Sequence, residues 1–573
     1  MSDTSNSKNL ARRDVFGLAA AAAALATTSA SAENALSPTK PSTRPMMFVP
    51  GTPLVTQVID TTSGRVQGLV SDGVQCFKGV RYGAPPVGAL RWMAPQRPEK
   101  ASVILDCSDF GAPAIQMAGG ATAAHATDFG LQMNRAFTTP SDIKIQSEDC
   151  LFLNVWTPAN DGKKRPVMFW IHGGGFAYGS GGQPIYDMEA LAREHDVCCV
   201  SINHRLNLFG YMHLGDAMGP AYASSATVGM QDIVLALEWV RDNIASFGGD
   251  PGNVTIMGQS GGGFKVSILL AMESAKGLFH KASIQSGPGL TVGRKEQAAK
   301  TTQAVLDELG IKAGDIKALQ AVPYQTLIAA ADAAAAKASG PRMPGMRGGG
   351  GGGFSFNPIV DDVALKRDPF APDAPAVSAD VPILIGYTKD EMALFMAAEP
   401  WFGTMTEEQL KQFIGFSGPK APAVLDAWRK ARPDYSPTYL FVATVSSMFA
   451  MGGSITLAER KFAQHAAPVF VWEMVWETPV ANGIFKAPHC MEIPFMLDSW
   501  RRVPQFVGPA KEAENMAKQI AGCWVAFAKT GAPNGPATPA WPPYDPTTRA
   551  TMLFDTKSKI VNDPFADVRK ALG

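Results

Sequence analysis

Runs of consecutive apolar residues alternate with segments of helical periodicity along most of the chain. Between Met230 and Ile244 apolar residues recur every three or four positions, which predicts an amphipathic helix. Further helices are expected at 264–272, 296–337 and 510–529, and antiparallel strands at 64–68 and 74–80. Other apolar runs predict buried strands. One ends at Trp156, and another begins at 165 and runs into a glycine cluster. The remaining ones span 197–202, 254–257, 281–287, 381–387 and 469–476. This alternation predicts the α/β class, with a large, mostly parallel central sheet flanked by helices and elaborated by loop and helical insertions.

A glycine-rich turn joins one of these strands to a helix. The strand at 254–257 runs into Gly258-Gln-Ser-Gly-Gly262, and the helical segment 264–272 follows. Glycines two residues before and after Ser260 permit a sharp, strained turn that lifts the hydroxyl clear of the sheet. The helix N-terminus behind the turn favours developing negative charge. Ser260 is therefore a candidate nucleophile, the alternative being an ordinary glycine-rich turn.

An activated serine needs a base, and the order of elements selects one. Only His280, His465 and His489 follow Ser260 in the chain. His280 precedes the next strand, which leaves no strand between it and the serine to carry an acid. His465 enters the strand at 469–476 and so lies at its opposite end. His489 follows that strand and lies at the carboxyl edge of the sheet, where the sites of such sheets form.

The same edge carries the candidate acids. The strand at 381–387 ends in Thr388-Lys-Asp-Glu391, so Asp390 and Glu391 both qualify as the residue that orients the base. Their spacing does not choose between them, and both also suit the first turn of a helix.

Donors for an oxyanion are expected from two glycine clusters. Gly173, Gly174 and Gly175 follow a buried strand, and Gly261 follows the serine. Backbone N–H groups without side chains can approach a substrate closely and stabilise the negative oxygen of a tetrahedral intermediate.

The N-terminus resembles an export signal. Arg12 and Arg13 precede an apolar stretch, and Ala30-Ser-Ala32 has the small-residue pattern of a cleavage site. We therefore expect residues 1–32 to be a cleaved twin-arginine-like signal peptide, 33–54 a linker, and 55–573 a single domain that is periplasmic or secreted. The apolar stretch is too short to span a bilayer, and no membrane span is expected elsewhere.

Composition limits the kinds of partner and cofactor that we expect. The 573 residues are 46% hydrophobic and 18% charged with a formal net charge of +0, which gives no reason to expect nucleic acid. The seven cysteines include no C-x-x-C pair, so no metal or redox motif is expected. Cys198 and Cys199 are expected to fill core, and Cys490 to be inert filling beside His489.

Ordered sequence blocks place the chain near a known family. They are Tyr82-Gly-Ala-Pro-Pro-Val-Gly-Ala-Leu-Arg91, Ser147-Glu-Asp-Cys-Leu-Phe-Leu-Asn-Val155, Trp170-Ile-His-Gly-Gly-Gly-Phe176, Phe247-Gly-Gly-Asp-Pro251, Gly258-Gln-Ser-Gly-Gly262, Phe356-Asn-Pro-Ile-Val-Asp361, Gly386-Tyr-Thr-Lys-Asp-Glu391 and His489-Cys-Met-Glu492. With these blocks the chain resembles the type-B carboxylesterases, the esterase/lipase/cholinesterase family, from about Val55 to about Phe565.

The resemblance implies an α/β-hydrolase fold and roles for particular residues. Ser260 would be the nucleophile, Glu391 rather than Asp390 the acid, and His489 the base. The oxyanion donors would be Gly174, Gly175 and Gly261. Arg91 and Glu148 match a buried ion pair of the family, and Cys150 matches a disulfide cysteine whose usual partner position holds Ala114, with Cys107 a less certain substitute.

Departures from the family pattern concern the substrate. Gln259 replaces the usual Glu and Gly261 the usual Ala, and no tryptophan lies at 137–146, so capture of a choline cation is not expected. We expect Gln259, Phe176 and Phe354 to line the substrate pocket. The glycines at 348–353 are expected to form a flexible connector, or to leave the pocket open beside Phe354 for bulky acyl groups.

These features predict a serine hydrolase that cleaves small-molecule carboxylic esters through an acyl-enzyme and needs neither metal nor organic cofactor. The chain is expected to be a monomer or a small homo-oligomer. An amide or carbamate hydrolase of the same fold is the alternative within this chemistry. A binding protein that has lost catalysis is the alternative from another class, and the presence of all three triad residues argues against it.

Overall fold

The computed structural model describes residues 54–116, 146–338, 356–397 and 399–573. All of them belong to one compact unit, Thr52–Gly573. The expected signal peptide, nearly all of the linker, Phe354 and the glycine run lie outside the described residues.

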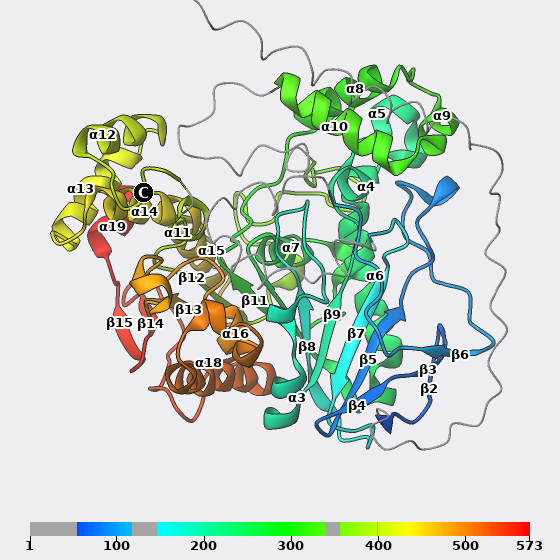
Figure 1. Ribbon diagram of the computed structural model, residues 1–573, viewed down its shortest axis with the longest axis horizontal. Coiled ribbons are helices and arrows are strands. Elements are labelled where there is room, and N and C mark those ends of the chain that lie inside the picture. Colours follow the sequence, from blue (N-terminus) through cyan, green and yellow to red (C-terminus); the bar gives the residue numbers. More distant parts are fainter. Residues whose placement is uncertain (1–53, 117–145, 339–355, 398) are drawn as a thin grey trace, which may run out of the picture. The chain divides into compact units, whose positions relative to one another are not determined.

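A twelve-stranded sheet forms the centre of this unit (Figure 1). In spatial order its strands are β1 (Leu54–Val55), β4 (Leu69–Ser71), β5 (Val74–Arg81), β7 (Phe152–Thr157), β9 (Cys198–Ile202), β8 (Arg165–Ile171), β10 (Gly249–Gln259), β11 (Lys281–Gln285), β12 (Ile383–Thr388), β13 (Val469–Met474), β14 (Ala550–Phe554) and β15 (Lys559–Asn562). Pairing is parallel from β9 to β14 and antiparallel elsewhere. A small second sheet contains β2 (Ile59–Thr61), β3 (Gly64–Gln67) and β6 (Ile104–Asp106).

Both faces of the large sheet are buried, which explains its continuous apolar runs. In β8, Val167 and Phe169 point into one core, while Met168 and Trp170 point into the other. The first core includes α6 (Val228–Asn243), and the second includes α3 (Glu189–His195) and α18 (Ala510–Thr530). The sheet is therefore one layer between two helical layers, as the α/β prediction requires.

Two helical groups extend beyond the ends of the strands (Figure 1). One contains α8 (Lys295–Leu309), α9 (Ile316–Ala321) and α10 (Tyr324–Ala338), which together fill the predicted helical stretch 296–337. The other has its own core and contains α11 (Ala393–Met396), α12 (Glu407–Phe416), α13 (Ala421–Ala431), α14 (Pro437–Ser446) and α19 (Ala566–Leu572). These groups are the helical insertions expected from the sequence.

A single turn of π-helix, Ser447–Met451, joins α14 to α15 (Gly452–Phe462). The whole stretch Pro437–Phe462 is long and apolar enough to cross a membrane, but 61% of its apolar window is buried inside the protein. Its hydrophobicity is therefore accounted for by packing in the core.

The C-terminal end of the chain holds elements that the periodicity did not predict. The helix expected at 510–529 is α18, but β14, β15 and α19 follow it. β14 is five residues long and wholly buried, and α19 is seven residues long. Such short elements carry too few residues to show a period.

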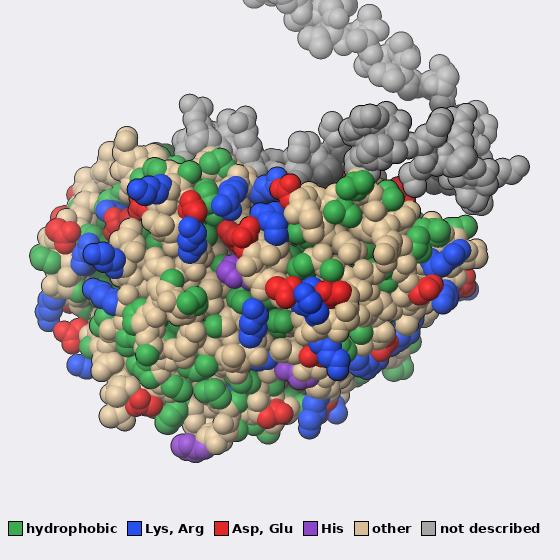
Figure 2. Space-filling view, turned by 90° about the horizontal axis from the view of Figure 1, so that it is seen from below, with side chains coloured by type: hydrophobic (Ala, Val, Ile, Leu, Met, Phe, Trp, Pro, Cys, Tyr) green, Lys and Arg blue, Asp and Glu red, His purple; other side chains and the backbone are tan. Residues whose placement is uncertain are grey.

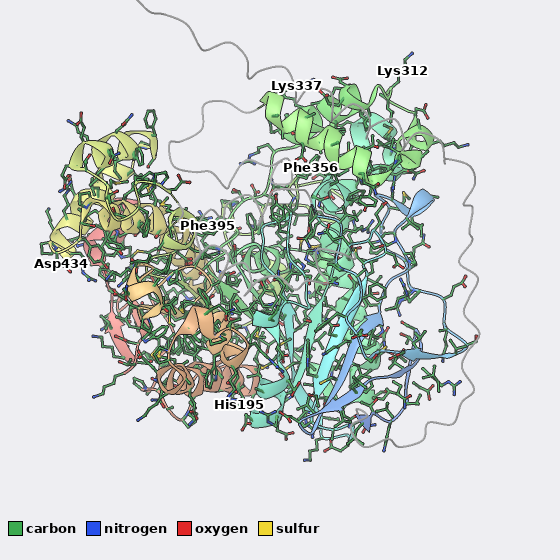
Figure 3. All side chains as sticks on the ribbon, viewed as in Figure 1. His195, Lys312, Lys337, Phe356, Phe395 and Asp434 are labelled. Carbon is green, nitrogen blue, oxygen red and sulfur yellow. The ribbon has the colours of Figure 1, made fainter. Side chains whose placement is uncertain are left out.

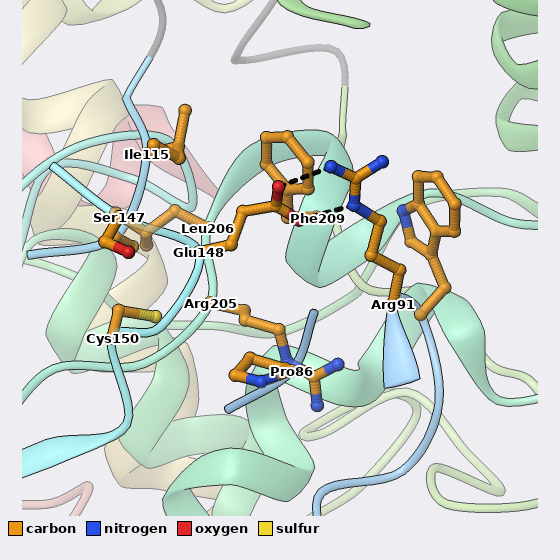
Figure 4. A pocket seen from close by; sticks show the side chains of 11 residues that line it. Pro86, Arg91, Ile115, Ser147, Glu148, Cys150, Arg205, Leu206 and Phe209 are labelled. Atoms are coloured by element: carbon orange, nitrogen blue, oxygen red, sulfur yellow. Dashed lines mark hydrogen bonds and ion pairs between the residues drawn. The ribbon is translucent and has the colours of Figure 1, made fainter. Parts of the chain in front are cut away.

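A buried ion pair ties the N-terminal loops to the rest of the fold (Figure 4). Arg91 Nε donates to Glu148 Oε2 at 2.6 Å, and the side chains are only 9% and 11% exposed. Arg91 also donates to the carbonyl oxygens of Gln320 and Val322 next to α9. The ion pair implied by the family resemblance is therefore present.

All seven cysteines are free and buried. Cys107 and Cys150 form no disulfide, and burial raises the pKa of both thiols. Cys198 and Cys199 lie in the fully buried strand β9, as predicted.

The surface in Figure 2 carries basic and acidic side chains interspersed, with hydrophobic ones between them. On this face no single sign of charge dominates, which agrees with the formal net charge of +0.

Candidate active site

The serine lies in a strained turn between β10 and α7 (Gly261–Leu269). Ser260 has φ 58° and ψ −123°, a conformation that residues with a side chain rarely adopt. The turn is held in place by Ser260 N, which donates to the carbonyl of Gln285 in β11 at 2.7 Å. The side chain of Ser260 remains partly exposed, as a nucleophile requires.

The flanking glycines are required by close backbone contacts. A Cβ on Gly258 would lie 2.4 Å from the backbone carbon of Gly262, and one on Gly262 would lie 2.1 Å from the carbonyl oxygen of Ile171. These contacts are shorter than any side chain allows, so the strand and the helix can meet at this angle only through glycine.

His489 and Glu391 come together at the carboxyl ends of β12 and β13. His489 Nδ1 is hydrogen-bonded to Glu391 Oε2, and both side chains are almost fully buried. Glu391 Oε1 accepts from the backbone N–H of Thr388 at 2.8 Å, which fixes the carboxylate. The imidazole is thereby held with Nδ1 towards the acid and Nε2 away from it.

Asp390 points elsewhere. Its Oδ2 accepts from the backbone N–H of Ala487 at 3.1 Å and lies 3.5 Å from Lys389 Nζ. Of the two acids that the strand spacing left open, the structure therefore brings Glu391, and not Asp390, to the imidazole.

Gln259 contacts the imidazole. Its Nε2 is 3.0 Å from His489 Nε2, and its Oε1 accepts from Cys490 Sγ at 3.2 Å. Gln259 is 1% exposed, so it lies against the imidazole and not in open space. Among the hydrogen bonds of the described residues, none joins the Ser260 hydroxyl to His489. Burial raises the pKa of the Cys490 thiol, which fits its expected role as filling.

A second carboxyl group lies close to Glu391. Glu492 is fully buried, and neither of its carboxyl oxygens has a hydrogen-bond partner among the described residues. Burial, and then the negative charge of Glu391, raise the pKa of Glu492 to about 8. Burial therefore favours the neutral form of Glu492.

The loop His172–Gly175 lies against the serine turn. A Cβ on Gly261 would lie 2.2 Å from the carbonyl oxygen of Gly175 and 2.5 Å from its amide nitrogen. Gly174 and Gly175 have φ of 86° and 63° and are accessible to solvent. Within the described part of the chain, the N–H groups of Gly174, Gly175 and Gly261 donate to no other group. The three predicted oxyanion donors are therefore adjacent and available.

Two exposed aromatic rings flank the histidine, and no sequence pattern predicts them. The ring of Phe395, in α11, is 5.1 Å from that of His489, and the ring of Phe449, in the π-helical turn, is 5.6 Å away. Their side chains are 52% and 45% exposed. Figure 3 shows Phe395 where the α11–α14 group faces the sheet. The π-helical turn that carries Phe449 is a feature often found at functional sites.

Phe176 packs behind the glycine loop. It is 4% exposed and meets Tyr211 and Phe264 edge to face. Its predicted role in the pocket stays a prediction, and the role predicted for Phe354 falls outside the described residues. The described residues contain no group of three or more His, Cys, Asp or Glu side chains that could hold a metal ion.

Comparison with known proteins identifies the family of the chain. The carboxylesterase family model matches residues 55–569. The chain belongs to the carboxylesterase family. Para-nitrobenzyl esterase of Bacillus subtilis is 34% identical to it over 521 residues, which cover 90% of this chain and 98% of that protein.

Solved structures of carboxylesterases are similar throughout. A carboxylesterase of Geobacillus stearothermophilus gives a TM-score of 0.76 at 35% identity, covering 90% of this chain and 100% of that one. An esterase from Clostridium hathewayi that can hydrolyze aliphatic aromatic polyesters gives a TM-score of 0.73 at 31% identity, covering 90% of this chain and 98% of that one. These matches confirm the predicted α/β-hydrolase fold and carboxylic ester hydrolase activity.

Sequence reasoning also missed one unusual residue of this carboxylesterase. Lys265 is the single charged residue in the apolar helical segment 264–272, and it is fully buried beside the glycine loop. A lone charge inside an apolar helical run is the signal that could have indicated it.

Substitution of Gly258 by Ala is expected to displace the serine turn, because the new Cβ would meet the backbone of Gly262. A shift of about 1 Å in a reacting group lowers activity by about 100-fold, so kcat/KM for p-nitrophenyl acetate should fall by at least that factor. The control is Gly415→Ala in α12, where no atom lies within 4 Å of the new Cβ. Normal activity of Gly258→Ala would contradict the steric argument.

Proposed function

We propose that this carboxylesterase cleaves esters through a covalent acyl-enzyme formed on Ser260, with His489 as base and Glu391 as its orienting acid. The hydrogen bond between His489 Nδ1 and the buried Glu391 Oε2, at the same sheet edge as the strained serine turn, is the observation that carries the proposal. A carboxylate on Nδ1 places the basic lone pair on Nε2 and stabilises the imidazolium that forms during catalysis.

The reaction takes place in two halves. His489 Nε2 removes the proton of Ser260 Oγ as the oxygen attacks the ester carbonyl, and the Gln259 amide gives up its contact with that nitrogen. The N–H groups of Gly174, Gly175 and Gly261 stabilise the resulting oxyanion. Collapse expels the alcohol, which takes the proton from His489. Water then attacks the acyl-enzyme with His489 again as base, and His489 returns the proton to Ser260 Oγ as the acyl bond breaks and the carboxylic acid leaves.

Esters that contain an aromatic ring are the proposed substrate class. The exposed rings of Phe395 and Phe449 beside His489 offer faces and edges against which a substrate ring can pack. Two of the relatives are described by aromatic substrates, para-nitrobenzyl esters and aliphatic aromatic polyesters.

Labelling by a fluorophosphonate probe tests the nucleophile. The wild-type protein should be labelled, and Ser260→Ala should lose both labelling and ester hydrolysis, because no other serine lies in the strained turn. Removal of the nucleophilic serine costs about 10⁶-fold in kcat in a comparable hydrolase. Equal labelling of the two proteins would remove Ser260 from this role, and an unlabelled wild type would favour a binding protein.

Paired amide variants test the acid. Glu391→Gln should lower kcat by about 10³–10⁴-fold, because an amide no longer favours the productive tautomer of His489. Asp390→Asn is the matched control, since Asp390 points to Ala487 and Lys389, and its kcat should change less than about 10-fold. The opposite order of effects would make Asp390 the acid.

Truncation of the two exposed rings tests the substrate class. An aromatic pair contributes about 0.5–1.5 kcal/mol, so Phe395→Ala and Phe449→Ala should each lower kcat/KM for benzyl acetate by about 2- to 12-fold relative to butyl acetate. Phe416→Ala, also exposed, at the end of α12, serves as control and should leave the ratio unchanged. If Phe395→Ala and Phe449→Ala leave the ratio of kcat/KM for benzyl acetate to that for butyl acetate unchanged, the proposed preference for aromatic esters is contradicted.

A further inference from the structure

Lys265 is a buried amine next to the glycine loop, and burial lowers the pKa of its side chain to about 7. Its side chain in α7 is inaccessible to solvent, and its Nζ donates to the carbonyl oxygen of Gly175 at 2.8 Å and to that of His172 at 3.2 Å. The Nζ also lies 5.4 Å from the centre of the Phe176 ring. Within the described residues no carboxylate pairs with it. A buried lysine without a carboxylate partner is costly to the folded state, so this position calls for an explanation beyond packing.

The two carbonyls that Lys265 binds bracket the glycine loop. Between them, the Gly173 carbonyl lies 2.9 Å from His172 Nδ1, and the Gly174 carbonyl accepts from the N–H groups of Ala177 and Tyr178. Lys265 thus holds the first and last of four successive carbonyls, and other groups hold the middle two. In a planar trans peptide the N–H points opposite to the carbonyl. With the carbonyls of Gly173 and Gly174 held, the N–H groups of Gly174 and Gly175 are turned away from them.

The charge of Lys265 also acts on a neighbouring imidazole. The rings of His172 and His204 stack at 4.7 Å with 9° between their planes. Burial, and then the positive charge of Lys265, lower the pKa of His172 to about 3. His172 therefore stays neutral at ordinary pH, and the tautomer with a proton on Nδ1 donates to the Gly173 carbonyl.

We propose that Lys265 is a positioning residue for the oxyanion site, holding both ends of the loop His172–Gly175 by its two hydrogen bonds. The proposal rests on the proposed function, since it concerns the same serine reaction. Donors that are fixed before the reaction stabilise the transition state more than the bound ester, because the oxyanion exists only there. Loss of Lys265 should therefore act on kcat and leave KM nearly unchanged.

Three variants separate this role from packing. Lys265→Met keeps a similar volume and removes both hydrogen bonds and the charge, whereas Lys265→Gln keeps a neutral donor. The matched control is Lys461→Met in α15. Lys461 Nζ likewise donates to two carbonyl oxygens, those of Ser378 and Ala379, but these precede β12, at the opposite edge of the sheet from Ser260.

The measurements are kcat and KM for p-nitrophenyl butyrate, affinity for a trifluoromethyl ketone, and the rate of fluorophosphonate labelling. Since loss of one oxyanion donor costs about 10²–10³-fold, misplacing the loop should lower kcat of Lys265→Met by about 10–100-fold, with KM changing less than about 3-fold. Affinity for the ketone, whose adduct with serine is an oxyanion, should fall by a similar factor. Lys265→Gln should fall between Lys265→Met and wild type, and Lys461→Met should match wild type in kcat.

Two results would overturn the inference. The first is that Lys265→Met and Lys461→Met have the same kcat and the same affinity for the ketone. The second is that Lys265→Met changes only KM. If Lys265→Met does not fold, Lys265→Gln decides by the same criteria. A wild type that is not labelled at Ser260 would refute the proposed function itself, whereas a labelled wild type with unaffected Lys265 variants would refute only the role of Lys265.

Discussion

The site depends on backbone packing that leaves no room for side chains. The turn at Ser260 brings the end of β10, the start of α7 and the loop after β8 within contact distance of one another. Gly258, Gly262 and Gly261 each face another backbone segment closer than a Cβ could approach. This packing leaves the serine partly exposed, places the candidate oxyanion donors beside it and forces the strained φ of Ser260.

Buried charge forms a second layer around this turn. On one side Lys265 lies behind the glycine loop, and on the other Glu391 holds His489. Burial and the nearby Glu391 raise the pKa of Glu492, which favours its neutral form. Lys265 thus holds the loop that carries the candidate oxyanion donors, and Glu391 holds the candidate base, as the proposed ester cleavage needs.

The order of strands along the chain predicts much of the candidate site. Parallel strands bring their carboxyl ends to one edge, so Ser260, Glu391 and His489 can be grouped from chain order alone. Spacing leaves Asp390 and Glu391 open, because adjacent residues in a loop point in directions that only the fold decides. Phe395 and Phe449 cannot be found in this way, since a short helix and a π-helical turn bring them to the site from a separate helical group.

The sequence by itself determined the sheet class, the glycine turn, the order of the catalytic candidates and the family, because periodicity and short motifs are local properties. Tertiary structure decided which acid meets His489, that Gln259 lies against the imidazole, and that Lys265 binds the carbonyls of the glycine loop. Each of these contacts joins residues far apart in the chain. Their direction depends on how the helices and loops pack around the sheet, which no local pattern records.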